Sequence, residues 1–187
     1  MALMVSINGS PRRNSRTGEL LDAVCYAISG AVSLERASVN LATDGRHIMS
    51  GLTRDELEPR GEDLLRLVER ADLLIVGSPV YRASYTGLLK HLFDLVERTA
   101  LTGRKAVLVA SGGTALHGLM LEHQLRPLLG FFGVLTVPTA IYALDSDFDG
   151  GRVMGADLIN RITRAAQEAV NVISAYTASE GRLATVA

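Results

Sequence analysis

Apolar residues along this chain gather into short continuous runs, separated by stretches in which they recur at helical spacing. The runs are rich in Val, Ile and Leu, as in strands that are buried on both faces of a parallel sheet. We expect strands at residues 3–7, 33–41, 73–76, 106–110 and 134–137, the last with room to resume after Pro138.

Apolar residues three and four positions apart fill most of the intervals between these runs. This spacing predicts helices from Leu20 to about Gly30, around 64–68, at 87–97, at 116–132 and across 158–173. Residues 42–60 differ, because Gly45, Gly51 and Pro59 lie among charged side chains with no clear period. They predict a long loop with a short helical turn at 53–57.

Strands that alternate with helices predict an α/β fold, a doubly wound five-stranded parallel sheet with the flavodoxin-like order 2-1-3-4-5. We expect a single domain at residues 1–178, followed by a frayed tail at 179–187. In such sheets, ligands bind beyond the carboxyl ends of the strands, near the switch point between strands 1 and 3. That rule brings three loops, residues 10–17, 79–84 and 111–114, to one edge.

The first loop, residues 9–17, lies between a strand and a helix and carries Ser10, Arg12, Ser15 and Thr17. A helix N-terminus offers unpaired N–H groups to an anion, and hydroxyls and arginine add further donors. Neither the Walker pattern nor the G-x-G-x-x-G fingerprint is present, and no carboxylate in the loop could hold Mg²⁺. The loop suits a metal-free phosphomonoester such as that of FMN. The alternative is a solvated turn that caps the helix.

The other two loops have the composition of surfaces that contact a planar ring. Pro79 sets a rigid turn, and Tyr81 offers an apolar ring with a polar tip. Gly112 and Gly113 let the backbone approach a ligand closely. Each loop alone is equally typical of an ordinary turn, so the functional interpretation depends on their convergence.

Charge and composition narrow the range of partners. The 187 residues carry a net charge of -1, with 19 basic and 20 acidic residues well mixed. We therefore expect no nucleic acid and no membrane among the partners. Cys25 is the single cysteine and is expected in the core, and the start of the chain lacks the pattern of a signal peptide, so we expect a cytoplasmic protein.

No metal site is expected. Residues 145–150 match the opening of an EF-hand loop, but Ala156 stands where the bidentate Glu belongs. The four histidines show no ligand spacing, and no second cysteine is present.

Together, the three loops resemble those of the NAD(P)H-dependent FMN reductases of two-component alkanesulfonate and methanesulfonate monooxygenases. The resemblance rests on Gly9-Ser-Pro-Arg with Ser15 and Thr17, on residues 78–90 (SPVYRASYTGLLK), and on Ala110-Ser-Gly-Gly-Thr with residues 125–129 (LRPLL), and it spans residues 3 to about 142. Arg82 and His123 make the chain more similar to the methanesulfonate branch.

The resemblance implies that hydride passes from NAD(P)H to FMN, and that the reduced flavin goes to a flavin-dependent monooxygenase. It implies phosphate contacts from Ser10, Arg12, Ser15 and Thr17, and ring contacts from Pro79, Val80, Tyr81, Arg82, Ser111, Gly112 and Gly113. No catalytic acid or base is needed. Alternatives are a quinone, azo-dye or metal-ion reductase with bound FMN, a non-enzymatic flavodoxin-type carrier, and an interaction module without flavin.

The helix at 116–132 contains Pro127, which removes the helical partner of the carbonyl of His123. Either a kink or a π-bulge is expected there. In the reductases that this chain resembles, the position of His123 carries the residue whose insertion makes such a bulge, next to the flavin and an oligomer interface. The resemblance also implies a homo-oligomer, a dimer or a tetramer. Five apolar residues on these helices would supply its interface: Phe93, Leu95, Met120, Phe131 and Phe132.

Overall fold

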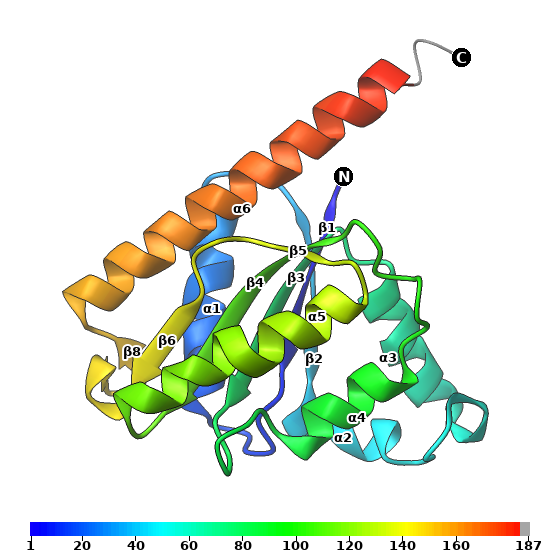
Figure 1. Cartoon of the computed structure of the whole chain (residues 1–187), viewed down its shortest axis with the longest axis horizontal. Coiled ribbons are helices and arrows are strands. Elements are labelled where there is room, and N and C mark those ends of the chain that lie inside the picture. The colour runs from blue at the N-terminus through cyan, green and yellow to red at the C-terminus, as the bar shows by residue number, and fades with distance from the viewer. Residues whose placement is uncertain (184–187) are drawn as a thin grey trace.

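A parallel sheet forms the centre of the molecule (Figure 1). The computed structural model describes residues 1–183, with side chains described through Ser174. The strands run in the order β2-β1-β3-β4-β5, and β6 pairs with the second half of β4. They are β1 (Leu3–Asn8), β2 (Glu35–Asn40), β3 (Leu73–Pro79), β4 (Lys105–Gly112), β5 (Leu135–Thr136) and β6 (Ile141–Leu144). The flavodoxin-like order is confirmed, and the fifth position is shared by β5 and β6.

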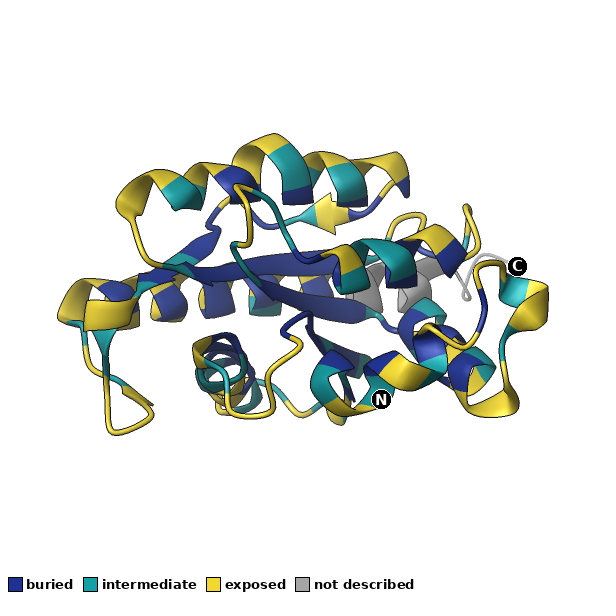
Figure 2. Ribbon diagram, turned by 90° about the horizontal axis from the view of Figure 1, so that it is seen from below, coloured by how far each residue is buried: buried dark blue, intermediate teal, exposed yellow. Residues whose placement is uncertain are grey.

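Helices cover both faces of the sheet. The helices α1 (Arg16–Ser29) and α6 (Ala156–Leu183) pack on one face, and α2 (Leu41–Ile48), α3 (Pro59–Glu69), α4 (Gly87–Leu95) and α5 (Arg126–Phe131) pack on the other. Figure 2 shows the central strands in the colour of buried residues, between these layers. The apolar run of β3 is buried throughout Leu73–Ser78, as a strand covered on both faces must be.

The segment expected to be a long loop contains the helix α2. The Asn40 side chain accepts a hydrogen bond from Ala42 N and so caps the helix. Gly45 does not mark a turn here. A Cβ at that position would lie 2.8 Å from Leu88 Cδ2, so the glycine lets α2 pack closely against α4. The short helical turn expected at 53–57 is confirmed as η1 (Arg54–Glu56).

The helix expected at 116–132 is broken into three kinds of turn. A 3-10 segment, η2 (Ala115–Gly118), is followed by a π-helical turn, η3 (Leu121–Leu125), and then by α5. Arg126 N–H donates to the carbonyl of Leu121, five residues back. The irregularity expected from Pro127 is confirmed as a π turn with His123 at its centre.

A small hairpin between β6 and α6 was not expected from the sequence. The 3-10 turn η4 (Asp145–Asp147) leads into β7 (Phe148–Asp149), which pairs antiparallel with β8 (Arg152–Val153). Gly150 and Gly151, with φ of 52° and 82°, supply the left-handed turn between them. Residues 145–150 therefore open a hairpin and not a calcium loop.

The apolar residues expected at an oligomer interface mostly belong to the core. Phe93, Leu95, Met120 and Phe132 are buried, because the faces that carry them turn toward the sheet. Phe131 differs, since 64% of it is exposed. The expected tail at 179–187 lies beyond the last described side chain, and 184–187 lie outside the described residues.

Candidate active site

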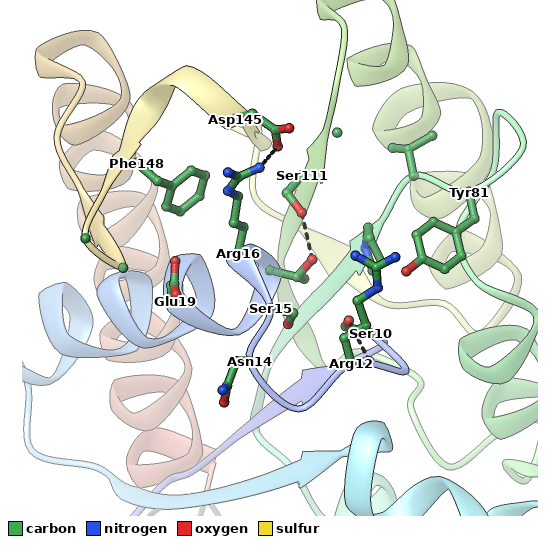
Figure 3. A pocket seen from close by; sticks show the side chains of 16 residues that line it. Ser10, Arg12, Asn14, Ser15, Arg16, Glu19, Tyr81, Ser111, Asp145 and Phe148 are labelled. Carbon is green, nitrogen blue, oxygen red and sulfur yellow. Dashed lines mark hydrogen bonds and ion pairs between the residues drawn. The ribbon is translucent and has the colours of Figure 1, made fainter.

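A cavity of about 500 Å³ opens at the carboxyl edge of the sheet (Figure 3). The three loops expected to converge do meet there, and the hairpin after β6 closes a further side. The expected residues that line the cavity are Ser10, Arg12, Ser15, Thr17, Pro79, Val80, Tyr81, Ser111 and Gly112. The size is within the usual range for sites that hold a small molecule or cofactor.

The first loop is held in shape by its own side chains. Asn8 Oδ1 accepts a hydrogen bond from Ser10 N at 3.0 Å, and Ser10 Oγ accepts one from Arg12 N at 3.2 Å. Ser15 caps α1 by accepting from Gly18 N at 3.1 Å. The guanidinium of Arg12 has no hydrogen bond or ion pair with any described residue, so it can bind an anion without first breaking a contact.

A buried hydrogen bond joins the first loop region to the third. Thr17 Oγ1 and Ser111 Oγ lie 2.7 Å apart, and both residues are buried. This contact links the first turn of α1 to the end of β4. The two hydroxyls thereby fix the spacing between two walls of the cavity.

The third loop needs its first glycine for a packing reason. A Cβ on Gly112 would lie 2.6 Å from the hydroxyl of Tyr142. That hydroxyl donates to the carbonyl of Thr114 at 2.6 Å, and burial raises the pKa of Tyr142, so the phenol keeps its proton. Gly112 therefore makes room for a tyrosine of β6 as well as for the cavity.

The second loop ends in a tight two-residue turn. Val80 N donates to Ser111 O at 2.8 Å, which ties the loop to β4. Tyr81 and Ser84 exchange two backbone hydrogen bonds, and Arg82 and Ala83 between them have φ of 51° and 64°.

The π-helical segment η3 hydrogen-bonds the two-residue turn at Arg82 and Ala83 through Gln124. Gln124 Nε2 donates to Ala83 O at 2.8 Å, and Ser84 Oγ donates to Gln124 Oε1. His123, the neighbour of Gln124, is exposed and does not line the cavity. The connection between η3 and the cavity therefore runs through Gln124.

Two expected residues do not line the cavity. Arg82 lines a second cavity of about 530 Å³ instead, which shares Arg12, Val80 and Tyr81 with the first. Gly113 lines neither cavity; it follows the end of β4 at Gly112 and is exposed.

Sequence reasoning missed the wall made by the hairpin and by the start of α1. Arg16 forms an ion pair with Asp145, and its guanidinium carbon lies 5.9 Å from the centroid of the Phe148 ring. Glu19 also lines the cavity. The dipeptide Gly150-Gly151 is a two-residue hairpin signal that could have located this wall.

Other reactive groups lie away from the cavity. Cys25 is buried in the core as expected, and burial raises the pKa of its thiol to about 11, so it is not a nucleophile at neutral pH. Within residues 1–183, no three His, Cys, Asp or Glu among the described side chains, which end at Ser174, are placed to hold a metal ion. No helix in that same range combines the length and apolarity needed to cross a membrane.

Comparisons with known proteins identify chains that are similar to this one. The family model described as NADPH-dependent FMN reductase matches residues 3–149. An NADH-dependent FMN reductase, SfnF, of Pseudomonas fluorescens is 40% identical over 173 residues, 92% of each chain. An FMN reductase (NADPH) of Pseudomonas aeruginosa is 40% identical over 166 residues, 89% of each chain. The crystal structure of an oxidoreductase from Corynebacterium diphtheriae superposes with a TM-score of 0.81 at 32% identity, covering 93% of this chain and 97% of that one.

Proposed function

Because this chain belongs to the NADPH-dependent FMN reductase family, we propose that the cavity at its sheet edge binds FMN as a substrate and releases it reduced to a separate monooxygenase. The protein is an oxidoreductase that reduces FMN with NAD(P)H. The observation that carries the placement is the convergence of three separate loops on one cavity.

The phosphate of FMN binds at the end of the cavity formed by residues 10–17. Arg12 supplies a guanidinium without a competing partner, and Ser10 and Ser15 supply hydroxyls beside the N-terminus of α1. Thr17 acts through its hydrogen bond to Ser111, which fixes the helix against β4.

The isoalloxazine ring binds between the second and third loops. Pro79, Val80 and Tyr81 offer an apolar surface, and Ser111 and Gly112 offer a narrow backbone edge. Arg82 and Gly113 are left out of the ring contacts, since they lie outside this cavity.

Bound FMN supplies the hydride acceptor, so the protein needs no acid or base of its own. The residues of the cavity would hold the flavin in place for a nicotinamide to approach it. Productive transfer requires the reacting atoms within about 3 to 3.5 Å, and the rigid turn at Pro79 and the Thr17–Ser111 contact serve that placement.

Sulfonate desulfonation is the proposed setting, on the strength of the loops shared with reductases of alkanesulfonate and methanesulfonate systems. A cytoplasmic location follows from the proposed use of a nicotinamide donor. We also propose a homo-oligomer, because Phe131 and Leu116 expose 64% and 77% of their surface on the helical layer that carries η3. A monomer mass at micromolar concentration would contradict the oligomer.

The test of the reaction mixes the purified chain with FMN and NADH or NADPH under argon. The flavin absorbance should bleach, and no bleaching with either donor would overturn the reductase. Rates with quinones, azo dyes and ferric chelates separate a flavin reductase from its relatives with bound FMN. Persistent one-electron reduced flavin in a dithionite titration would favour a carrier. Unquenched flavin fluorescence would favour an interaction module.

A further inference from the structure

A second cavity lies beside the proposed flavin cavity and has a different electrostatic character. It measures about 530 Å³ and is lined by Arg12, Val80, Tyr81, Arg82, Ala83 and His117. Two guanidinium groups and an imidazole line it, and no carboxylate does. The flavin cavity, by contrast, includes Glu19 and Asp145. The second cavity is therefore suited to an anion.

Arg82 is held at this cavity by a strained turn. Its φ of 51° and that of Ala83, 64°, lie in the left-handed region that favours glycine or asparagine. Residues held in this region are strained, and such strain concentrates at functional sites. Glycine would adopt this backbone conformation with less strain, so the presence of arginine indicates that its side chain has a function.

The surrounding structure keeps that turn from relaxing. Tyr81 and Ser84 close it with two backbone hydrogen bonds of 2.8 and 3.0 Å. Gln124 of η3 fastens its outer side through Ala83 O and Ser84 Oγ. The guanidinium of Arg82 itself makes no hydrogen bond or ion pair with any residue of the described chain. The backbone of Arg82 is therefore held in place, while its positive charge has no acidic partner among the described residues.

The two cavities are adjacent, because Arg12, Val80 and Tyr81 line both. A molecule whose ring stacks on the flavin can therefore extend past Tyr81 into the second cavity. A nicotinamide dinucleotide has this form, since one ribose separates its ring from a diphosphate. NADPH carries a further phosphate on the adenosine ribose.

We propose that the second cavity binds the phosphate groups of the nicotinamide hydride donor and that Arg82 is their main contact. This inference rests on the proposed flavin site. It assigns to Arg82 a role in binding the donor rather than the isoalloxazine ring.

The test compares Arg82→Gln with the parental chain. Glutamine keeps a long polar side chain and a similar backbone strain, and it removes the charge. The matched control is Arg152→Gln, which removes an exposed guanidinium from β8 that lines neither cavity and has no partner among the described residues. Two quantities are measured for each protein: KM for NADH and NADPH at saturating FMN, and the Kd of unreactive NADP⁺ by calorimetry.

Arg82→Gln should raise both quantities about threefold to tenfold, because charge-assisted hydrogen bonds are the strong ones and Arg82 is solvent-exposed. FMN affinity should stay unchanged. An equal rise for NADH and NADPH identifies the diphosphate, and a rise for NADPH alone identifies the ribose phosphate.

Unchanged KM and unchanged NADP⁺ binding would overturn the proposal, as would an equal effect of Arg152→Gln or a loss of FMN affinity instead. A parental chain that oxidises neither donor would overturn the reductase function separately. The NADP⁺ titration would still decide the role of Arg82.

Discussion

Arg16 and Asp145 form an ion pair across the wall of the proposed flavin cavity (Figure 3). Arg16 is the first residue of α1, where a phosphate would bind, and Asp145 directly follows β6. The Arg16 and Asp145 side chains are 47% and 63% exposed, so the pair itself stabilises the fold little. The pair should instead weaken the binding of a phosphate, because the Asp145 carboxylate competes with the phosphate for the Arg16 guanidinium.

Replacing this carboxylate should strengthen FMN binding. In Asp145→Asn, Arg16 is released and a negative charge leaves the cavity. An exposed pair is worth ~0.5–1 kcal/mol, so the Kd for FMN should fall about two- to fivefold, with little change for riboflavin. Flavin fluorescence titrations at low and high salt would measure both ligands.

The control for Asp145→Asn is Asp149→Asn in the same hairpin. It makes the same change in net charge, and Asp149 does not line the cavity. Equal strengthening by both variants would mean that the overall charge, and not the pairing with Arg16, sets the affinity.

Removing the unpaired guanidinium of the first loop should have the opposite effect. Hydrogen bonds to charged groups contribute roughly 1.5 to 3 kcal/mol, so Arg12→Ala should weaken FMN about tenfold or more and riboflavin much less. Ser15→Ala is a poorer probe, because it also removes the cap of α1 at a cost of about 1 kcal/mol. An equal loss for both flavins would place Arg12 away from the phosphate.

Deleting His123 should convert the π turn of η3 into regular helix. The segment that carries Gln124, which hydrogen-bonds the turn at Ala83 beside the cavity, would then become regular helix. We expect FMN to be retained more tightly and the supply of reduced flavin to a partner to fall, measured as flavin content after gel filtration and as transfer to a monooxygenase.

His123→Ala is the matched control for the deletion, since it keeps the inserted residue and loses only an exposed ring. It should behave like the parental chain. A deletion variant that purified without flavin and turned over free FMN at the parental rate would leave the π turn as a kink without a role.

Stability should fall in alkaline solution because of Cys25. Burial raises the pKa of this thiol from 9.0 to about 11. Below pH 9 both states hold the proton. Between pH 9 and 11 the unfolded chain loses it while the folded chain keeps it, so the free energy of unfolding falls by up to about 2 to 3 kcal/mol. Urea denaturation at a series of pH values would show the slope, and Cys25→Ala should lack this part of it.

The sequence predicted the sheet order and most of the cavity because both follow from local patterns and one general rule. Buried parallel strands are recognisable apolar runs, and the rule for their carboxyl ends brings Ser10, Pro79 and Ser111 together. What it missed depends on tertiary contacts. Gly45 suggested a loop, but it lies in a helix where it allows the close approach of Leu88. Arg82 lines a second cavity because it lies in a strained turn.

The buried contact between Thr17 and Ser111 has a kinetic consequence. With Asn8 holding Ser10, and Thr86 Oγ1 donating to Gly9 O at 2.6 Å, it leaves the walls of the cavity little to rearrange when flavin arrives. A preorganised site loses little entropy on binding, so the association rate should vary little among variants. Differences in affinity should then appear as differences in residence time. In the proposed function, in which reduced flavin passes to a monooxygenase, the residence time of the reduced product sets how soon it is released.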